Sequence, residues 1–191
     1  MKYILFFFLL LSARWATAQH LPELGPERVR LNGQDKNILA GIAPLSKAVK
    51  ARPALLYYWY SSGSIQVTQG GYDGHLLDGA YTEFYLHKNL KEQGTFKNGL
   101  KNGPWKEWSA QGVLLKSITW KEGVLSGPFQ YYTAEGRLQQ DGSYQNGLLE
   151  GASHQYTGKD SVETRYYRRG RVTVPRSFFQ RILFFKKRSV R

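Results

Sequence analysis

The strongest constraint in this sequence is an internal repeat with a period of 24 residues. Repeats decide the architecture of a chain, because each unit buries its apolar side only against its neighbours. Weaker copies flank the clear ones, from Tyr57 to Gly71 and from Tyr166 to Pro175. The period aligns two aromatic columns, one glycine column and one leucine column: Tyr72, Phe96, Trp120 and Tyr144; Phe84, Trp108, Tyr132 and Tyr156; Gly79, Gly103, Gly127 and Gly151; Leu90, Leu114 and Leu138.

The stretch FKNGLKNGPWKEW, residues 96–108, indicates what one repeat folds into. Asn-Gly between strand-like residues favours a hairpin with a type I′ turn, whose two central residues need positive φ. Asn98-Gly99, Glu122-Gly123 and Asn146-Gly147 occupy the same repeat position. The sequence therefore predicts an all-β fold, an elongated antiparallel sheet of tandem 24-residue hairpins, with a short amphipathic helix at the C-terminus only.

Alternation along the strands predicts two different faces. One face is expected to be the apolar core, and it would carry Tyr81, Trp105 and Phe129, the leucine column, and Phe96, Trp120 and Tyr144. The opposite face would carry the aromatic ladder Phe84, Trp108, Tyr132 and Tyr156. Gly94 and Gly142 are expected to pair with Gly103 and Gly151, leaving slots across which aromatic rings lie.

The chain divides into four segments. Residues 1–18, MKYILFFFLLLSARWATA, have the basic start, apolar run and small-residue cleavage site of a secretory signal, although an N-terminal anchor is the alternative. We expect an exported protein, periplasmic or secreted, for which a peripheral position at a membrane is an alternative. Residues 19–52 are expected to have little regular structure, residues 53–175 form the repeat array, and residues 176–191 form the tail. The absence of cysteine excludes a lipoprotein anchor, disulfides and thiol chemistry.

The net charge of +13 is concentrated at the C-terminus. Residues 53–164 hold 9 Lys/Arg against 11 Asp/Glu, whereas residues 165–191 hold ten basic residues and no acidic one. The tail sequence SFFQRILFFKKRSVR predicts an amphipathic helix that binds an anionic membrane surface, and a cap on the end of the sheet is the alternative. The candidate membrane-binding residues are Phe178, Phe179, Arg181, Ile182, Leu183, Phe185, Lys186, Lys187 and Arg188.

The units FKNGLKNGPWKEWSAQGVL and WKEGVLSGPFQYYTAEGRL resemble the MORN repeat variant, the bacterial relative of the membrane occupation and recognition nexus repeat. The resemblance covers about residues 57–175, but Ser153 and Arg176 stand where the pattern expects an aromatic residue. It implies an elongated sheet of stacked hairpins used for protein or membrane-surface contact. Some relatives carry the label of an antitoxin of a toxin-antitoxin pair, which is an alternative function.

The sequence favours a binding protein over an enzyme. His20, His75, His87 and His154 are scattered, so we expect no metal site and no cofactor. Glu83 and Glu107 recur with the period, which is more typical of solvated strand residues than of paired catalytic carboxylates. We expect a non-enzymatic scaffold of the cell envelope whose ladder residues contact a protein, peptide or glycan, unless the lead-in segment packs over them. We do not expect nucleic acid as a partner, because an exported chain rarely meets it.

Overall fold

A computed structural model describes residues 27–46, 48–158 and 161–174 of the chain. All of its regular structure in this part is β-strand, as predicted. The strands are β1 Glu27–Asn32, β2 Lys36–Ile42, β3 Leu56–Ser61, β4 Ser64–Gln69, β5 His75–Tyr85, β6 Leu90–Lys97, β7 Leu100–Trp108, β8 Leu114–Lys121, β9 Val124–Tyr132, β10 Leu138–Gln145, β11 Leu148–Leu149, β12 Gly151–Tyr156, β13 Val162–Arg168 and β14 Arg171–Thr173.

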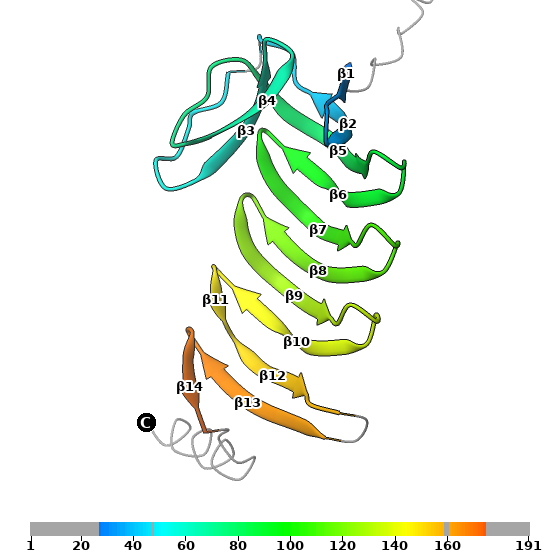
Figure 1. Cartoon of the computed structure of the whole chain (residues 1–191). Helices are drawn as coiled ribbons and strands as arrows, with labels where there is room; N and C mark the ends of the chain where they lie inside the picture. Colours follow the sequence, from blue (N-terminus) through cyan, green and yellow to red (C-terminus); the bar gives the residue numbers. More distant parts are fainter. Residues whose placement is uncertain (1–26, 47, 159–160, 175–191) are drawn as a thin grey trace, which may run out of the picture.

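The strands form one open antiparallel sheet in the order β1-β2-β5-β6-β7-β8-β9-β10-β12-β13-β14. From β5 onward, consecutive strands pair as successive hairpins, which step down the molecule as a ladder (Figure 1). The β3–β4 hairpin branches from this path, because β3 pairs with β4 along its length but with β5 only at His75 and Leu76. Figure 1 shows it projecting from the N-terminal end of the ladder, on the side of the turn that joins β6 to β7.

The turns between repeats explain the period. Asn98-Gly99, Glu122-Gly123 and Asn146-Gly147 all have positive φ at both residues, as the type I′ prediction requires. Each turn also bonds to the preceding repeat, since the amides of Gly99, Gly123 and Gly147 donate to the carbonyls of Leu77, Lys101 and Leu125 at 2.7, 2.8 and 2.8 Å. A 24-residue unit therefore places each turn against the same backbone position of its neighbour.

One face of the sheet, here called the core face, holds the buried aromatic residues. Tyr81, Trp105 and Phe129 are buried there, as predicted. Over its N-terminal half, the β3–β4 hairpin and the segment before it form a second layer. The Tyr58 ring lies 4.9 Å from that of Phe96, centroid to centroid, and the Tyr58 amide donates to the Gly99 carbonyl. Each buried aromatic ring contributes about 1.5–3 kcal/mol, so this face supplies the core.

Strands β1 and β2 correct one expectation, that residues 19–52 have little regular structure. β1 pairs with β2, and β2 pairs with β5, so the lead-in extends the sheet. Ile38, Ala40 and Ile42 of β2 are buried in the core beside Tyr81. The expectation was wrong because it relied on aromatic residues to mark the strands. The alternating apolar residues of β2 form a buried side without any aromatic residue.

One-residue β-bulges correct the assignment of the leucine column to the core face. An extra residue, Lys91, lies between the pairs Glu83–Glu92 and Phe84–Leu90, and Leu115 and Gln139 are the equivalent extra residues. Each bulge moves the side chains of the residues beyond it to the opposite face of the sheet. Leu90, Leu114 and Leu138 therefore pair directly with Phe84, Trp108 and Tyr132, and not with the core residues.

The glycine prediction is right in one part and wrong in another. A Cβ atom on Gly94 or Gly142 would collide with the ring of Trp105 or Phe129, so aromatic rings do lie across these glycines. However, the β6–β7 register shifts between Gln93 and Thr95, so Gly94 has no paired Gly103. Gly142 pairs with Phe129 on one side, and no Gly142–Gly151 pair forms on the other. Each slot is thus left by a single glycine and is filled by an aromatic ring.

Candidate binding surface

The face opposite the core, here called the ladder face, carries a continuous apolar row. Residues directly opposite each other in an antiparallel pair share a face, so the pairs Phe84–Leu90, Trp108–Leu114 and Tyr132–Leu138 bring the second aromatic column and the leucine column together. Tyr156 continues the row on β12, since it follows His154, the partner of Asp141, by two residues. The ladder row consists of Phe84, Leu90, Trp108, Leu114, Tyr132, Leu138 and Tyr156.

The ladder row is half-buried along its whole length. Successive aromatic residues lie two strands apart, which is about 9.5 Å, and no ring contact joins any two of these four aromatics. The described part of the lead-in packs elsewhere: Ala43, Val49 and Ala51 belong to the cluster around Tyr57 on the core side. Among the described residues, the row therefore has neighbours within its own sheet but no covering layer.

A polar row runs beside the ladder row, two residues away on β5, β7, β9 and β12 and three residues away, across the bulge, on β6, β8 and β10. Its members are linked by direct strand pairing from β5 to β12: Thr82, Gln93, Lys106, Ser117, Gln130, Asp141 and His154. Hydrogen bonds tie the two rows together. The Tyr132 hydroxyl donates to Gln130 Oε1 at 3.0 Å, and the Tyr156 hydroxyl donates to Asp141 Oδ2 at 3.2 Å. His154 Nδ1 lies 2.7 Å from Asp141 Oδ1.

Sequence reasoning did not single out this polar row, although the signal was present. Thr82, Lys106, Gln130 and His154 lie 24 residues apart, and so do Gln93, Ser117 and Asp141. The period conserves the position but not the residue type, so a search for repeated residue types does not find it. Only the register shows that the two sets alternate on neighbouring strands.

The core face carries a separate charged cluster around Glu83. This carboxylate is buried, accepts a hydrogen bond from the Tyr81 hydroxyl at 2.6 Å, and lies 2.7 Å from Lys91 Nζ and 3.5 Å from Lys36 Nζ. Burial alone would raise the pKa of Glu83, but the hydrogen bonds from Lys91 and Tyr81 and the Lys36 charge lower it below its usual value. Burial, with the bond to Glu83, raises the pKa of Tyr81. These ion pairs hold Glu83 ionised inside the fold.

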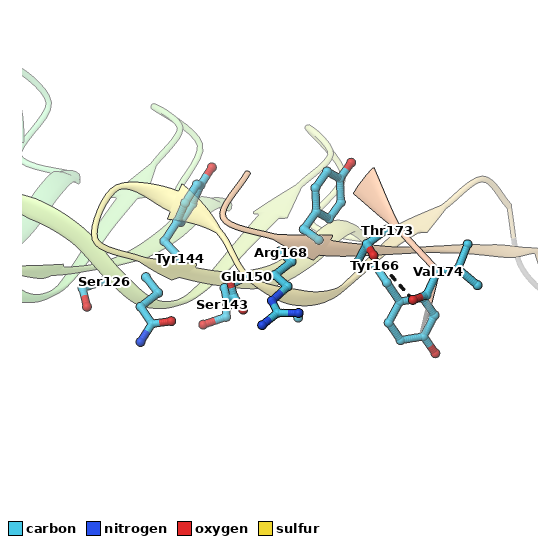
Figure 2. Close-up of a pocket in the computed structure, with 11 residues that line it drawn as sticks. Ser126, Ser143, Tyr144, Glu150, Tyr166, Arg168, Thr173 and Val174 are labelled. Atoms are coloured by element: carbon cyan, nitrogen blue, oxygen red, sulfur yellow. Dashed lines mark hydrogen bonds between the residues drawn. The ribbon is translucent and has the colours of Figure 1, made fainter. Parts of the chain in front are cut away.

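A groove of about 960 Å³ lies at the C-terminal end of the sheet. Its lining includes Tyr144, Glu150, Arg168 and Val174. Figure 2 shows Tyr144 on one side of the ribbon and Arg168 on the other. The Glu150 carboxylate accepts a hydrogen bond from the Arg169 amide at 2.7 Å, so it is engaged in the turn between β13 and β14. Ser126 and Ser143 also line the groove and lie on the same side as Arg168, so the groove opens mainly on the side of the sheet opposite the Tyr144 ring (Figure 2).

The other predicted sites have different outcomes. The tail residues proposed for membrane binding, and the proposed signal, lie outside the described residues. Within residues 27–46, 48–158 and 161–174 there is no group of three or more His, Cys, Asp or Glu side chains placed to hold a metal ion. The same ranges contain no helix long and apolar enough to span a bilayer. His75 Nδ1 lies 3.0 Å from the Ala43 carbonyl oxygen, in a structural contact.

Comparison with known proteins supports the repeat assignment. Residues 77–98 match a family described as the MORN repeat variant. No curated protein and no solved structure matched the chain. The matched segment comprises most of β5, the whole turn that joins β5 to β6, and all of β6. Equivalent hairpins follow it at β7–β8 and β9–β10. The chain thus carries a MORN repeat variant within an array of β-hairpins.

Proposed function

We propose that this chain is a non-enzymatic scaffold of the cell envelope that binds a partner protein through the ladder face. The observation that carries the proposal is the uncovered ladder row, in which four aromatic side chains alternate with three leucines across seven strands. Six strand spacings make the row about 29 Å long. Tyr, Trp and Phe are enriched at the centres of protein interfaces.

The dimensions suit a protein interface of standard size. Such an interface buries about 800 Å² on each partner, and a square of that area has a side of about 28 Å, close to the length of the row. The adjoining polar row supplies the hydrogen-bonding rim that interfaces need. The envelope assignment rests on the signal-like residues 1–18.

In-cell photocrosslinking tests the proposal. A photoreactive phenylalanine replaces Tyr132 on the ladder face, and in the matched control it replaces Tyr131, the adjacent residue on the core face of the same strand. We expect a discrete crosslinked species in envelope fractions with position 132 and none with position 131. Crosslinks of equal yield at both positions, or none at position 132, would contradict a partner on the ladder face.

The polar row favours one second candidate, a linear glycan. Sugar rings stack their apolar C–H faces on aromatic side chains and offer hydroxyls to amides, carboxylates and hydroxyls, and the two rows present both groups side by side. Successive strands twist by about 20–25°, so a flexible soluble chain fits better than a flat crystalline surface. Titration with soluble β-1,4-linked oligosaccharides tests this, and binding that survives Trp108→Ser would exclude the ladder as the glycan site.

A further inference from the structure

Two positions of the repeat, those of Phe96 and Leu100, are buried in the N-terminal half of the core face and more exposed in the C-terminal half, whereas the position of Tyr81, Trp105 and Phe129 is buried throughout. Leu100 is 5% exposed, whereas Leu148, two repeats later, is 49% exposed. Phe96 is 2% exposed, while its equivalents Trp120 and Tyr144 are only half-buried. The open half of the core face is defined here as Trp120, Val124, Tyr144 and Leu148.

The covered half shows what closes such a surface. There, Tyr57 is buried in one cluster with Leu100, and Tyr58, Tyr60 and Ile65 pack against the cluster that contains Phe96. The cover is thus a segment of the same chain that supplies several large apolar side chains. Among the described residues, no segment does the same for the open half.

We propose that residues 175–191 dock on the open half of the core face and form its cover. The described chain stops at Val174, one residue after β14 and at the C-terminal end of the sheet (Figure 1). Val172 and Val174 are both exposed at this point. The 17 residues that follow contain a dense apolar set: Phe178, Phe179, Ile182, Leu183 and Phe185.

The connection is long enough, and the charges are arranged suitably. Phe178 is four residues beyond Val174, a reach of up to about 14 Å for an extended chain. Basic residues are concentrated after the apolar set, at Lys186, Lys187, Arg188 and Arg191, so they can stay in water. Glu107 is paired with Lys116 and Glu92 with Lys101, and the Glu150 carboxylate already accepts a hydrogen bond from the Arg169 amide. Docking is therefore apolar and persists at high salt, unlike adhesion by charge.

The tail is proposed to dock on the core face, whereas the partner site is proposed on the ladder face. Either proposal can therefore be contradicted without affecting the other. Trypsin digestion of the purified full chain in high salt tests it, because Arg181 lies inside the apolar set. The variant Trp120→Ser with Tyr144→Ser removes apolar contacts of the open half. The matched control, Trp108→Ser with Tyr132→Ser, removes the same kinds of residue from the ladder face.

We expect cleavage after Arg181 to be about tenfold faster in the Trp120/Tyr144 variant than in the wild type, because the cleavage rate follows the population of the undocked tail. In the control variant we expect the same cleavage rate as in the wild type. Equal rates in all three proteins, or equal acceleration in both variants, would overturn the inference. Hydrogen exchange of residues 75–105 checks that the sheet stays folded. If the double variant unfolds, Leu148→Ser, at an exposed position, replaces it and should accelerate cleavage in the same direction; an unchanged rate would overturn the inference.

A final arm adds phosphatidylglycerol vesicles to the wild-type chain. We expect slow cleavage after Arg181 without vesicles and no further slowing with them. Fast cleavage without vesicles and protection only in their presence would show that a membrane, not the core face, receives the tail.

Discussion

The indole ring of Trp105 lies across the backbone of Gly94, where an added Cβ atom would sit 2.2 Å from Cδ2 of the ring. Phe129 of β9 lies over Gly142 of the following strand, β10, where an added Cβ atom would sit 2.8 Å from Cε1, whereas Trp105 of β7 lies over the preceding strand, β6. In both cases the ring fills the space that a side chain would take on a neighbouring strand. The aromatic residue and the glycine of the repeat form a single packing unit.

The first prediction is that Gly94→Ala destabilises the fold by about 1–3 kcal/mol, as other overpacked cores do, because the rigid indole must move. Gly142→Ala should cost less, since its contact with the ring is longer. Gly71→Ala is the control, because nothing lies within 4 Å of a Cβ atom at that position. Urea titration measures all three, and a Gly94→Ala loss no larger than that of Gly71→Ala would contradict the packing account.

Much of this fold could be predicted from the sequence, because turn chemistry and side-chain period are local. The turn at Asn98-Gly99 and the ring over Gly94 both follow from such local rules. The bulges at Lys91, Leu115 and Gln139 do not follow from these rules, because no residue type marks a bulge. Each bulge moves the side chains beyond it to the opposite face of the sheet. The leucine column was therefore placed on the wrong face, and the ladder row was predicted with only its four aromatic members.

The second prediction concerns Glu122-Gly123, an inter-repeat turn that departs from Asn-Gly. Glu122 has φ +47°, in the region where Asn98 and Asn146 stand in the other repeats. A non-glycine residue there costs about 1–2 kcal/mol, less for asparagine. Its exposed ion pair with Arg52, at 3.5 Å, contributes about 0–1 kcal/mol. Glu122→Asn should therefore leave the urea midpoint unchanged or raise it, and a clear decrease would mean that the Arg52 contact dominates.

The third prediction is a pH dependence at Glu83. Its folded-state pKa is lower than the ordinary value of 4.5, so its contribution is complete above that value and is lost as pH falls through the lower folded pKa. Glu83→Gln should cost about 1.5–3 kcal/mol at neutral pH, the usual contribution of hydrogen bonds to charged groups.

Unfolding titrations at pH 7 and in acid, below the folded pKa, check this prediction. The gap between wild type and Glu83→Gln should shrink in acid, where the wild-type carboxylate is also neutral. Glu27→Gln, on the exposed strand β1, is the control and should change stability by less than about 0.5 kcal/mol at either pH. A gap that stays constant with pH would show that the charge of Glu83 does not stabilise the fold.

The central claim is that the sheet has one face that forms the core and one that is free to bind. Trp105 and Trp108 lie on the same strand, β7, on opposite faces, and only Trp105 is buried, at 3% exposed. The most direct test is the free energy of unfolding of Trp105→Ala and Trp108→Ala, measured by denaturant titration. We predict a loss of about 3–5 kcal/mol for Trp105→Ala, as for other buried aromatic residues, and a clearly smaller loss for Trp108→Ala. Equal losses would mean that both faces are buried, and the ladder face could not then be the binding surface.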